Sequence, residues 1–389
     1  MDAARVIDHG SRDQERTWLV ALLIGIFALH AYPFFRYVSG DLQTAVMGWY
    51  RNIADNGWAA FAEPFSNYSP PYLYLLGITS IFDGIIPDHE LLKLLSLGGA
   101  IWLALAAARL LRILNRPRWY AIGVLLLPSI VQNTSLFGQS DVFWAAFCVH
   151  ALIAAVEKKY FWVAFWSGAA FAFKAQAVCF APFVAYLFIR HHVPLWKWAV
   201  PLFVYVVAII PAWLAGWPLW DLLTVYLHQA QWQPGGGYFI SNSASWWTIY
   251  GWLAPEYALK TFWIGFLSTG VATIGYCLFM PNLSGARLVA AAALSAGFVP
   301  FLLPGMHDRF FILADVLAFL YALARPTPRT IAAAILMQIG SAWPGYVWGL
   351  QMPRWDIFAP PFAAAALLIL VYEVSLSTRR AGKIEAAIN

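Results

Sequence analysis

Runs of roughly 20 apolar residues recur along this chain between residues 18 and 376. A helix of about 20 residues spans the hydrocarbon core of a bilayer, whereas the strands of a β-barrel alternate polar and apolar residues, which these runs do not. Only 11% of the 389 residues are charged, against about 25% in a soluble domain. The sequence therefore predicts an all-α polytopic membrane protein.

About twelve membrane spans account for these runs when most of the 24 Lys and Arg residues lie on the inner side, where such residues are enriched. Both termini are then cytoplasmic, and the net charge of +5 reflects topology rather than a nucleic-acid partner. The first 16 residues are too acidic and too charged for a cleavable signal peptide. The expected spans are 18–38, 92–113, 119–136, 141–157, 161–173, 177–189, 197–215, 259–280, 287–303, 309–325, 331–350 and 357–376.

Two long outer loops remain between these spans. The apolar run 71–86 is not taken as a span, because a crossing there would move the basic residues 109–118 outside; we expect 39–91 to carry helices in the membrane interface, chiefly at 42–62. The second loop, 216–258, contains Gly235-Gly236-Gly237 and many aromatic residues, and a loop this long is usually functional. No repeat, linker or soluble domain is visible, so residues 1–389 are predicted to form one membrane-embedded domain.

Four polar segments that are distant in sequence fall on the outer side in this topology. Their convergence on one face indicates an active site rather than scattered membrane anchors. The two short spans 161–173 and 177–189 are expected to be kinked or to meet at a recess around Lys174. The four segments are Asp41, Gln139–Asp141, Lys174–Gln176 and His307–Asp308–Arg309.

The carboxylates of the first segments each have two interpretations. Asp41 either caps the helix that follows it, as Asp often does, or acts as a general base that accepts a proton from an attacking hydroxyl. The turn that contains Tyr68 is fixed by two prolines and is either a plain helix start or a wall that positions substrate. Asp141 either caps the next helix or joins Gln139 in hydrogen bonding to sugar hydroxyls.

The cationic residues suit a phosphate group. Lys174 lies in an otherwise apolar stretch, where a charge costs a few kcal/mol and indicates function unless the side chain reaches the interface. Arg309 offers the planar fork that binds phosphate in a bidentate manner, and His307 can donate a further hydrogen bond. The alternative is that Asp308 and Arg309 pair locally as an interfacial anchor.

Nothing in the sequence indicates a cofactor. There is no nucleotide-binding motif and no convincing metal-ligand spacing, and a Mg²⁺ or Mn²⁺ ion shared by Asp41 and Asp141 has no further support. The three cysteines lie in separate apolar runs without redox or metal spacing, which favours core packing.

Taken in order, these segments resemble those of the GT-C superfamily of integral-membrane glycosyltransferases, and most of all bacterial relatives of the GPI mannosyltransferases. The resemblance covers residues 18–325. Each motif is short, and the ordered set is what carries the likeness. The matching residues are Gly40-Asp41, Tyr68-Ser69-Pro70-Pro71-Tyr72-Leu73-Tyr74, Gly138-Gln139-Ser140-Asp141, Lys174-Ala175-Gln176 and Pro304-Gly305-Met306-His307-Asp308-Arg309-Phe310.

The resemblance implies a GT-C-type fold that transfers a sugar, such as mannose or another hexose, from a polyprenyl-phosphate donor. The acceptor would be a glycolipid or an envelope glycan on the periplasmic face of a bacterial inner membrane. It implies transfer with inversion, with Asp41 as the base and His307, Arg309 and Lys174 at the donor phosphate. Tyr68, Gln139, Asp141, Gln176 and Asp308 would contact substrate; Asp308 stands where the family has Glu.

Two other functions compete with this one. A transporter or flippase of lipid-linked glycans also has intramembrane charges, but it should place them at mid-membrane and show a repeat between its halves. A non-catalytic scaffold for envelope assembly would tolerate loss of Asp41 or Arg309 without loss of any chemistry.

Overall fold

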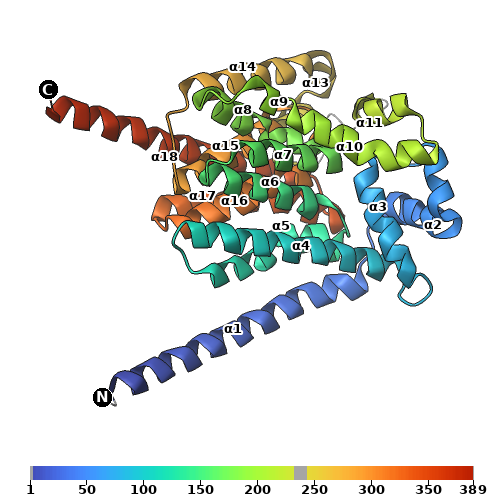
Figure 1. The fold of residues 1–389 in the computed structure, drawn as a ribbon, viewed down its shortest axis with the longest axis horizontal. Coiled ribbons are helices and arrows are strands. Elements are labelled where there is room, and N and C mark those ends of the chain that lie inside the picture. Colours follow the sequence, from blue (N-terminus) through green and yellow to red (C-terminus); the bar gives the residue numbers. More distant parts are fainter. Residues whose placement is uncertain (1–2, 232–242, 389) are drawn as a thin grey trace.

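The computed structural model describes the backbone of residues 3–231 and 243–388. This part of the chain is helical throughout and contains no strand, which confirms the all-α prediction. Helices α1 (Ala3–Arg36) and α18 (Ala359–Ile388) carry the two termini away from the bundle at one end, the terminal end. Helices α2 (Met47–Asn56), α3 (Pro70–Thr79) and α11 (Leu219–Gln231) lie at the opposite end, the loop end (Figure 1).

Three of the described helical stretches are long and apolar enough to cross a membrane by length and composition. They are α4 (Asp88–Ile113), the consecutive helices α9 (Leu195–Trp198) and α10 (Val200–Ala215), and the stretch Trp355–Leu376 at the start of α18. These stretches fit a helical membrane protein. The total of twelve crossings stays a prediction, because six further apolar helices of the described chain have only 10–17 residues.

Most of the expected spans coincide with helices. Several of these helices begin at a proline or after a threonine. For example, Thr327 caps the helix that begins at Pro328 through reciprocal hydrogen bonds with Thr330. The remaining longer helices are α6 (Asp141–Val156), α7 (Tyr160–Phe173), α8 (Ala181–Arg190), α12 (Trp246–Leu253), α13 (Pro255–Thr261), α14 (Trp263–Phe279), α15 (Ala286–Leu302), α16 (Ile312–Ala324) and α17 (Pro328–Gly349).

The prediction of one continuous helix over 119–136 is wrong. A 3₁₀ segment (Arg118–Leu126) is followed by the single turn α5 (Pro128–Val131) and by a π-helical turn (Gln132–Leu136). Pro128 has no N–H to continue the preceding hydrogen-bond ladder, so the helix restarts there. The break brings the polar side chains of Gln132 and Asn133 to the loop end.

The chain also breaks at Lys174, as the two short spans predicted. Helix α7 ends at Phe173, Lys174 is extended with φ −159° and ψ 136°, and a 3₁₀ segment (Ala175–Phe180) leads into α8. The extended residue turns the lysine side chain out of the helical register, which places its ammonium group in the interior at the loop end.

The first outer loop contains several short helices. A π-helical turn (Leu42–Val46) leads into α2, which ends at Gly57, where φ is +57°. A 3₁₀ segment (Gly57–Ala62) follows, and Pro70 and Pro71 begin α3, since neither needs an N–H donor in the first turn. The helices expected within 42–62 are thus present, with an interruption at Gly57.

The most buried helices are α6, α15 and α16, and small residues line their contacts. Along α15 every residue from Leu288 to Pro300 is buried, including the run Ala290–Ala293. A Cβ on Gly297 would lie 2.7 Å from Leu367 of α18, so only glycine permits that approach. Large apolar side chains on α10 and α14 are instead exposed, as expected for faces that contact lipid.

Candidate functional site

Asp41 lies at the loop end, directly after α1. One of its carboxylate oxygens accepts a hydrogen bond from Nη1 of Arg309 at 2.7 Å, which joins residues 268 positions apart. The Asp41 side chain is 49% exposed and that of Arg309 is 18% exposed. Asp41 makes no side-chain capping bond to the helical turn that follows. The capping interpretation therefore fails, and the carboxylate faces both a cation and solvent.

Asp141 and Lys174 form a second ion pair, which is buried. Lys174 Nζ lies 2.8 Å from Asp141 Oδ1, and the two side chains are 2% and 0% exposed. Asn133 and Trp144 also donate to the Asp141 carboxylate, at 3.0 and 3.1 Å. Three donors thus engage this carboxylate, which leaves it suited to holding Lys174 rather than to contacting a sugar directly.

Tyr68 connects the two ion pairs. Lys174 Nζ lies 4.8 Å from the centre of its ring, within cation–π range. Trp49 and Tyr72 pack against the same ring, at centroid distances of 4.9 and 5.7 Å. Arg309 and Lys174 both act on the Asp41 carboxylate: burial alone would raise its pKa, but these cations lower it. The two cations and two carboxylates therefore form one electrostatic cluster.

The segment that carries His307, Asp308 and Arg309 is a turn between α15 and α16. Gly305 has a φ of +73°, His307 is extended, and a 3₁₀ turn (Asp308–Phe311) follows. The Asp308 carboxylate packs against α17, where a Cβ on Gly345 would lie 2.1 Å from its Oδ2. Since the ion pair of Arg309 runs to Asp41, Asp308 and Arg309 do not act as a local anchor.

The protonation states follow from burial and from these charges. Burial alone would raise the pKa of Asp41, but Arg309, His307 and Lys174 outweigh it, so the pKa lies below its usual value. Burial and the neighbouring Arg309 lower the pKa of His307 to about 4. Burial raises the pKa of Asp308 to about 6, against the opposing effect of Arg309. At neutral pH, Asp41 is ionised and His307 is a neutral hydrogen-bond donor.

Buried polar atoms without a hydrogen-bond partner gather around this cluster. Such atoms are rare in folded proteins and call for an explanation, and a bound ligand is one. Arg309 uses Nη1 for Asp41, while its Nε has no partner in the described part of the chain. The others at this end of the molecule are Ser69 Oγ, Tyr72 OH, Asn133 Oδ1, Ser140 Oγ, Gln176 Oε1, Trp217 Nε1 and Asp308 Oδ2.

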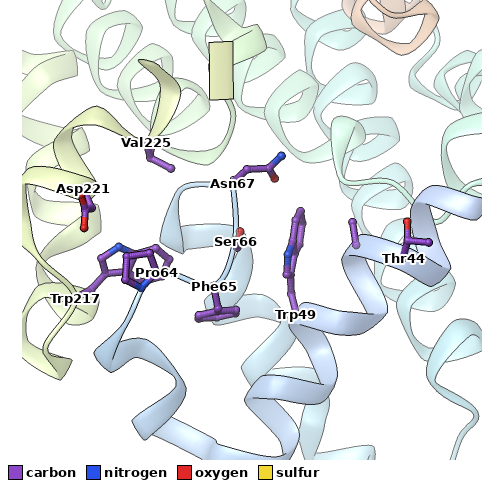
Figure 2. A pocket seen from close by; sticks show the side chains of 10 residues that line it. Thr44, Trp49, Pro64, Phe65, Ser66, Asn67, Trp217, Asp221 and Val225 are labelled. Carbon is purple, nitrogen blue, oxygen red and sulfur yellow. The ribbon is translucent and has the colours of Figure 1, made fainter. Parts of the chain in front are cut away.

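A cleft of about 600 Å³ opens beside the cluster (Figure 2). One wall comes from the first outer loop, with Thr44, Trp49 and the segment 64–67. The other wall comes from the start of the second loop, with Trp217 and Asp221. Trp49 belongs to this wall and also packs on Tyr68, so the cleft adjoins the charged cluster. The predicted loop residues Trp232, Gly235-Gly236-Gly237 and Tyr238 lie outside the described residues.

The two glutamines have different surroundings. Gln139 is 2% exposed; its carbonyl accepts a hydrogen bond from Ser96 and its N–H donates to the carbonyl of Asn133. Gln176 is half-buried, and its side-chain oxygen has no partner among the described residues. Gln176 thus has an acceptor available for a ligand, whereas the hydrogen bonds given for Gln139 are those of its backbone.

The sequence analysis overlooked Lys93, which is fully buried in α4 at the loop end. Its Nζ donates to the carbonyls of Pro33 and Phe34 at 2.9 and 2.8 Å, and to that of Tyr37. The available signal was a lysine inside the apolar run Leu91–Leu95, which resembles the signal that singled out Lys174.

The carboxylates considered for a metal ion each face a cation instead. Asp41 pairs with Arg309, and Asp141 pairs with Lys174. Among the residues that the structure describes, no three His, Cys, Asp or Glu side chains are grouped to hold a metal.

The comparisons with known proteins assign no family. No protein-family model matches the chain, and a search of curated proteins finds no match.

Proposed function

We propose that this chain is a glycosyltransferase that moves a sugar from a polyprenyl-phosphate donor to a hydroxyl of a lipid-linked or cell-envelope acceptor. The site would face the periplasm from a bacterial inner membrane. The observation that carries the proposal is the contact of 2.7 Å between Asp41 and Arg309. A base and a phosphate-binding guanidinium are the two groups that transfer from a sugar phosphate needs, and here they are adjacent.

Arg309 is placed to bind the donor phosphate while it keeps its hydrogen bond to Asp41. Its Nη1 holds Asp41 while its Nε has no partner among the described residues. The guanidinium fork can therefore bridge the carboxylate and a phosphate oxygen. Neutral His307 adds a donor from the same turn, and the charge of Lys174, screened by Asp141, adds longer-range attraction. Negative charge grows on the phosphate as it leaves, so these groups stabilise the transition state.

Asp41 is the group that receives the acceptor proton. Its pKa is lowered by Arg309, so the carboxylate is ionised before the reaction. The acceptor oxygen attacks the anomeric carbon, its proton passes to Asp41, and the bond from that carbon to the phosphate oxygen breaks with the electron pair left on the phosphate. Approach opposite to the leaving phosphate gives inversion. Half of the Asp41 side chain is exposed, which leaves room for the acceptor hydroxyl.

The cleft beside the cluster suits a saccharide. The half-buried indole ring of Trp49 offers an apolar face to a sugar ring, and Asn67 and Asp221 offer hydrogen bonds to its hydroxyl groups. An apolar groove of about 580 Å³ lies between the first outer loop and α10, lined by residues such as Trp58, Ile78 and Pro211. Such a groove suits the hydrocarbon part of a lipid-linked substrate.

The test is glycosyl transfer by the purified protein in detergent. Polyprenyl-phosphate sugars are supplied with envelope glycolipid extracts, and wild type is compared with Asp41→Asn. Loss of a general base typically costs 10²- to 10⁴-fold in rate, so we expect a loss of at least about 100-fold. The matched control is Asp55→Asn, which changes an exposed carboxylate of α2 at the same end of the molecule.

Three outcomes separate the possibilities. Transfer by wild type and Asp55→Asn, but not by folded Asp41→Asn, supports the proposal. Equal transfer by all three proteins assigns the base to another residue. If wild type transfers nothing across the donor panel, with and without divalent cations, the glycosyltransferase proposal fails, and flipping of labelled glycolipid in vesicles tests the transporter alternative.

A further inference from the structure

The backbone just before Asp41 accepts hydrogen bonds from a buried lysine, Lys93. Helix α1 ends at Arg36, and the last carbonyl groups of a helix have no partner within it. Lys93 Nζ donates to the carbonyls of Pro33, Phe34 and Tyr37. An ammonium group has three N–H donors, so all of them are used on this one turn. Asp41 follows the last of these carbonyls by four residues.

Ser96 lies one turn further along α4 and holds a second segment of the site. Its hydroxyl donates to the carbonyl of Gln139 at 2.7 Å. Gln139 precedes Asp141 by two residues, and Asp141 holds Lys174. Positions three apart share a helix face. One buried face of α4 therefore contacts both the chain before Asp41 and the chain before Asp141.

The two segments also meet each other next to Lys93. Gly138 has a φ of +61°, and a Cβ there would lie 3.1 Å from Leu42 and 3.4 Å from Cγ of Lys93. Ser39 donates to the carbonyl of Phe137 at 3.3 Å and accepts from the N–H of Leu42 at 3.2 Å. A change at Lys93 would therefore be transmitted to the Asp41 turn through direct contacts.

We propose that Lys93 is a positioning residue of the active site, which together with Ser96 sets the separation between Asp41 and the Asp141–Lys174 pair. The inference rests on the proposed function for its catalytic meaning. Lys93 acts through the backbone, because the charges that lower the Asp41 pKa come from Arg309, His307 and Lys174. A shift of about 1 Å in a catalytic group can cost 10²-fold in rate, so a residue that fixes this turn controls the turnover number.

The test replaces Lys93 with methionine, which matches the lysine side chain as far as Cε and removes the ammonium group with its three hydrogen bonds. The matched control is Leu103→Ala, which opens a cavity at another fully buried position of α4. We expect Lys93→Met to lower kcat at least about tenfold with little change in the donor KM. The acid limb of its pH profile should stay in place. Leu103→Ala should lower the unfolding temperature and leave kcat near wild type.

Hydrogen exchange of the backbone gives a readout that does not need the reaction. Exchange at residues 37–43 should quicken in Lys93→Met and stay at the wild-type rate in Leu103→Ala. If Lys93→Met does not accumulate, Lys93→Gln, which still donates from an amide, should show the same effects to a smaller degree.

The outcomes distinguish this inference from the proposed function. If wild type transfers sugar and the Lys93 variants match its kcat and its exchange, the positioning role is refuted while the function stands. If wild type transfers nothing but exchange quickens only in the Lys93 variants, the structural role holds and the proposed function fails. If hydrogen exchange at residues 37–43 quickened equally in Leu103→Ala, Lys93 would contribute to general stability only, and the positioning role would be refuted.

Discussion

The buried pair of Asp141 and Lys174 gives the sharpest energetic prediction. The two side chains are 0% and 2% exposed, so neither charge is solvated by water once its partner is lost. Removing one partner of a buried pair costs about 3–5 kcal/mol, whereas replacing both by neutral groups is often nearly neutral. We therefore expect Asp141→Asn and Lys174→Met each to destabilise the protein strongly. The double variant should lose less unfolding free energy than the two single variants lose together.

The surrounding hydrogen bonds refine these magnitudes. In Lys174→Met the carboxylate keeps its bonds from Asn133 and Trp144, each worth about 1.5–3 kcal/mol to a charged acceptor. In Asp141→Asn the ammonium loses its buried counter-charge and keeps the Tyr68 ring, worth up to about 2 kcal/mol, and at most one neutral amide oxygen. Asp141→Asn should therefore cost the upper end of the range, and Lys174→Met the lower end.

The assay is a double-mutant cycle, with unfolding followed in mixed micelles of increasing denaturing detergent. Because the one side-chain oxygen of Asn at position 141 can still accept from Trp144, and no buried charge is left unpaired, the double variant should recover at least about 2 kcal/mol relative to additivity. Recovered stability should not bring back sugar transfer, since Lys174 is missing. A coupling energy below about 0.5 kcal/mol, or a cost below about 1 kcal/mol for Asp141→Asn, would refute the reasoning that this pair is buried and mutually dependent.

Three further predictions follow from the turn at residues 305–311. In Gly345→Ala the new Cβ would overlap Asp308, so stability should fall by about 1–3 kcal/mol, whereas Gly48→Ala, with open space around it, should be nearly neutral; equal unfolding midpoints would contradict this. Burial raises the pKa of Asp308 to about 6, so the stability that its protonated form contributes below pH 4 is lost as the pH rises through 6. The loss should be roughly 3 kcal/mol in all, about half of it between pH 5 and 7.5, and Asp308→Asn should abolish it. Melting curves at pH 5 and 7.5 that change equally in both proteins would count against this prediction. Arg309→Lys offers no planar fork to bridge Asp41 and a phosphate, so the donor KM should rise about tenfold or more, and an unchanged KM would argue against phosphate binding at this residue.

The sequence by itself determined that the chain is helical and favours a membrane protein, because lipid requires long apolar helices whose backbone groups are satisfied internally. It also singled out Asp41, Lys174 and Arg309, since a charge near the membrane is costly without a role. Their gathering at one end followed from the rule that basic loops stay inside.

Only the tertiary structure decided how these residues are paired. Ion pairs across 268 positions depend on helix packing, which no local pattern encodes, so sequence left open whether Arg309 pairs with Asp308 or further away. The carbonyl groups that Lys93 holds also depend on helix packing, whereas the break at Pro128 follows from the missing N–H of proline and could have been predicted. A hydrophobic run predicts that a segment is buried, but not which segments it contacts. Packing between helices decides those contacts, and with them which base, cation and supporting residue come together.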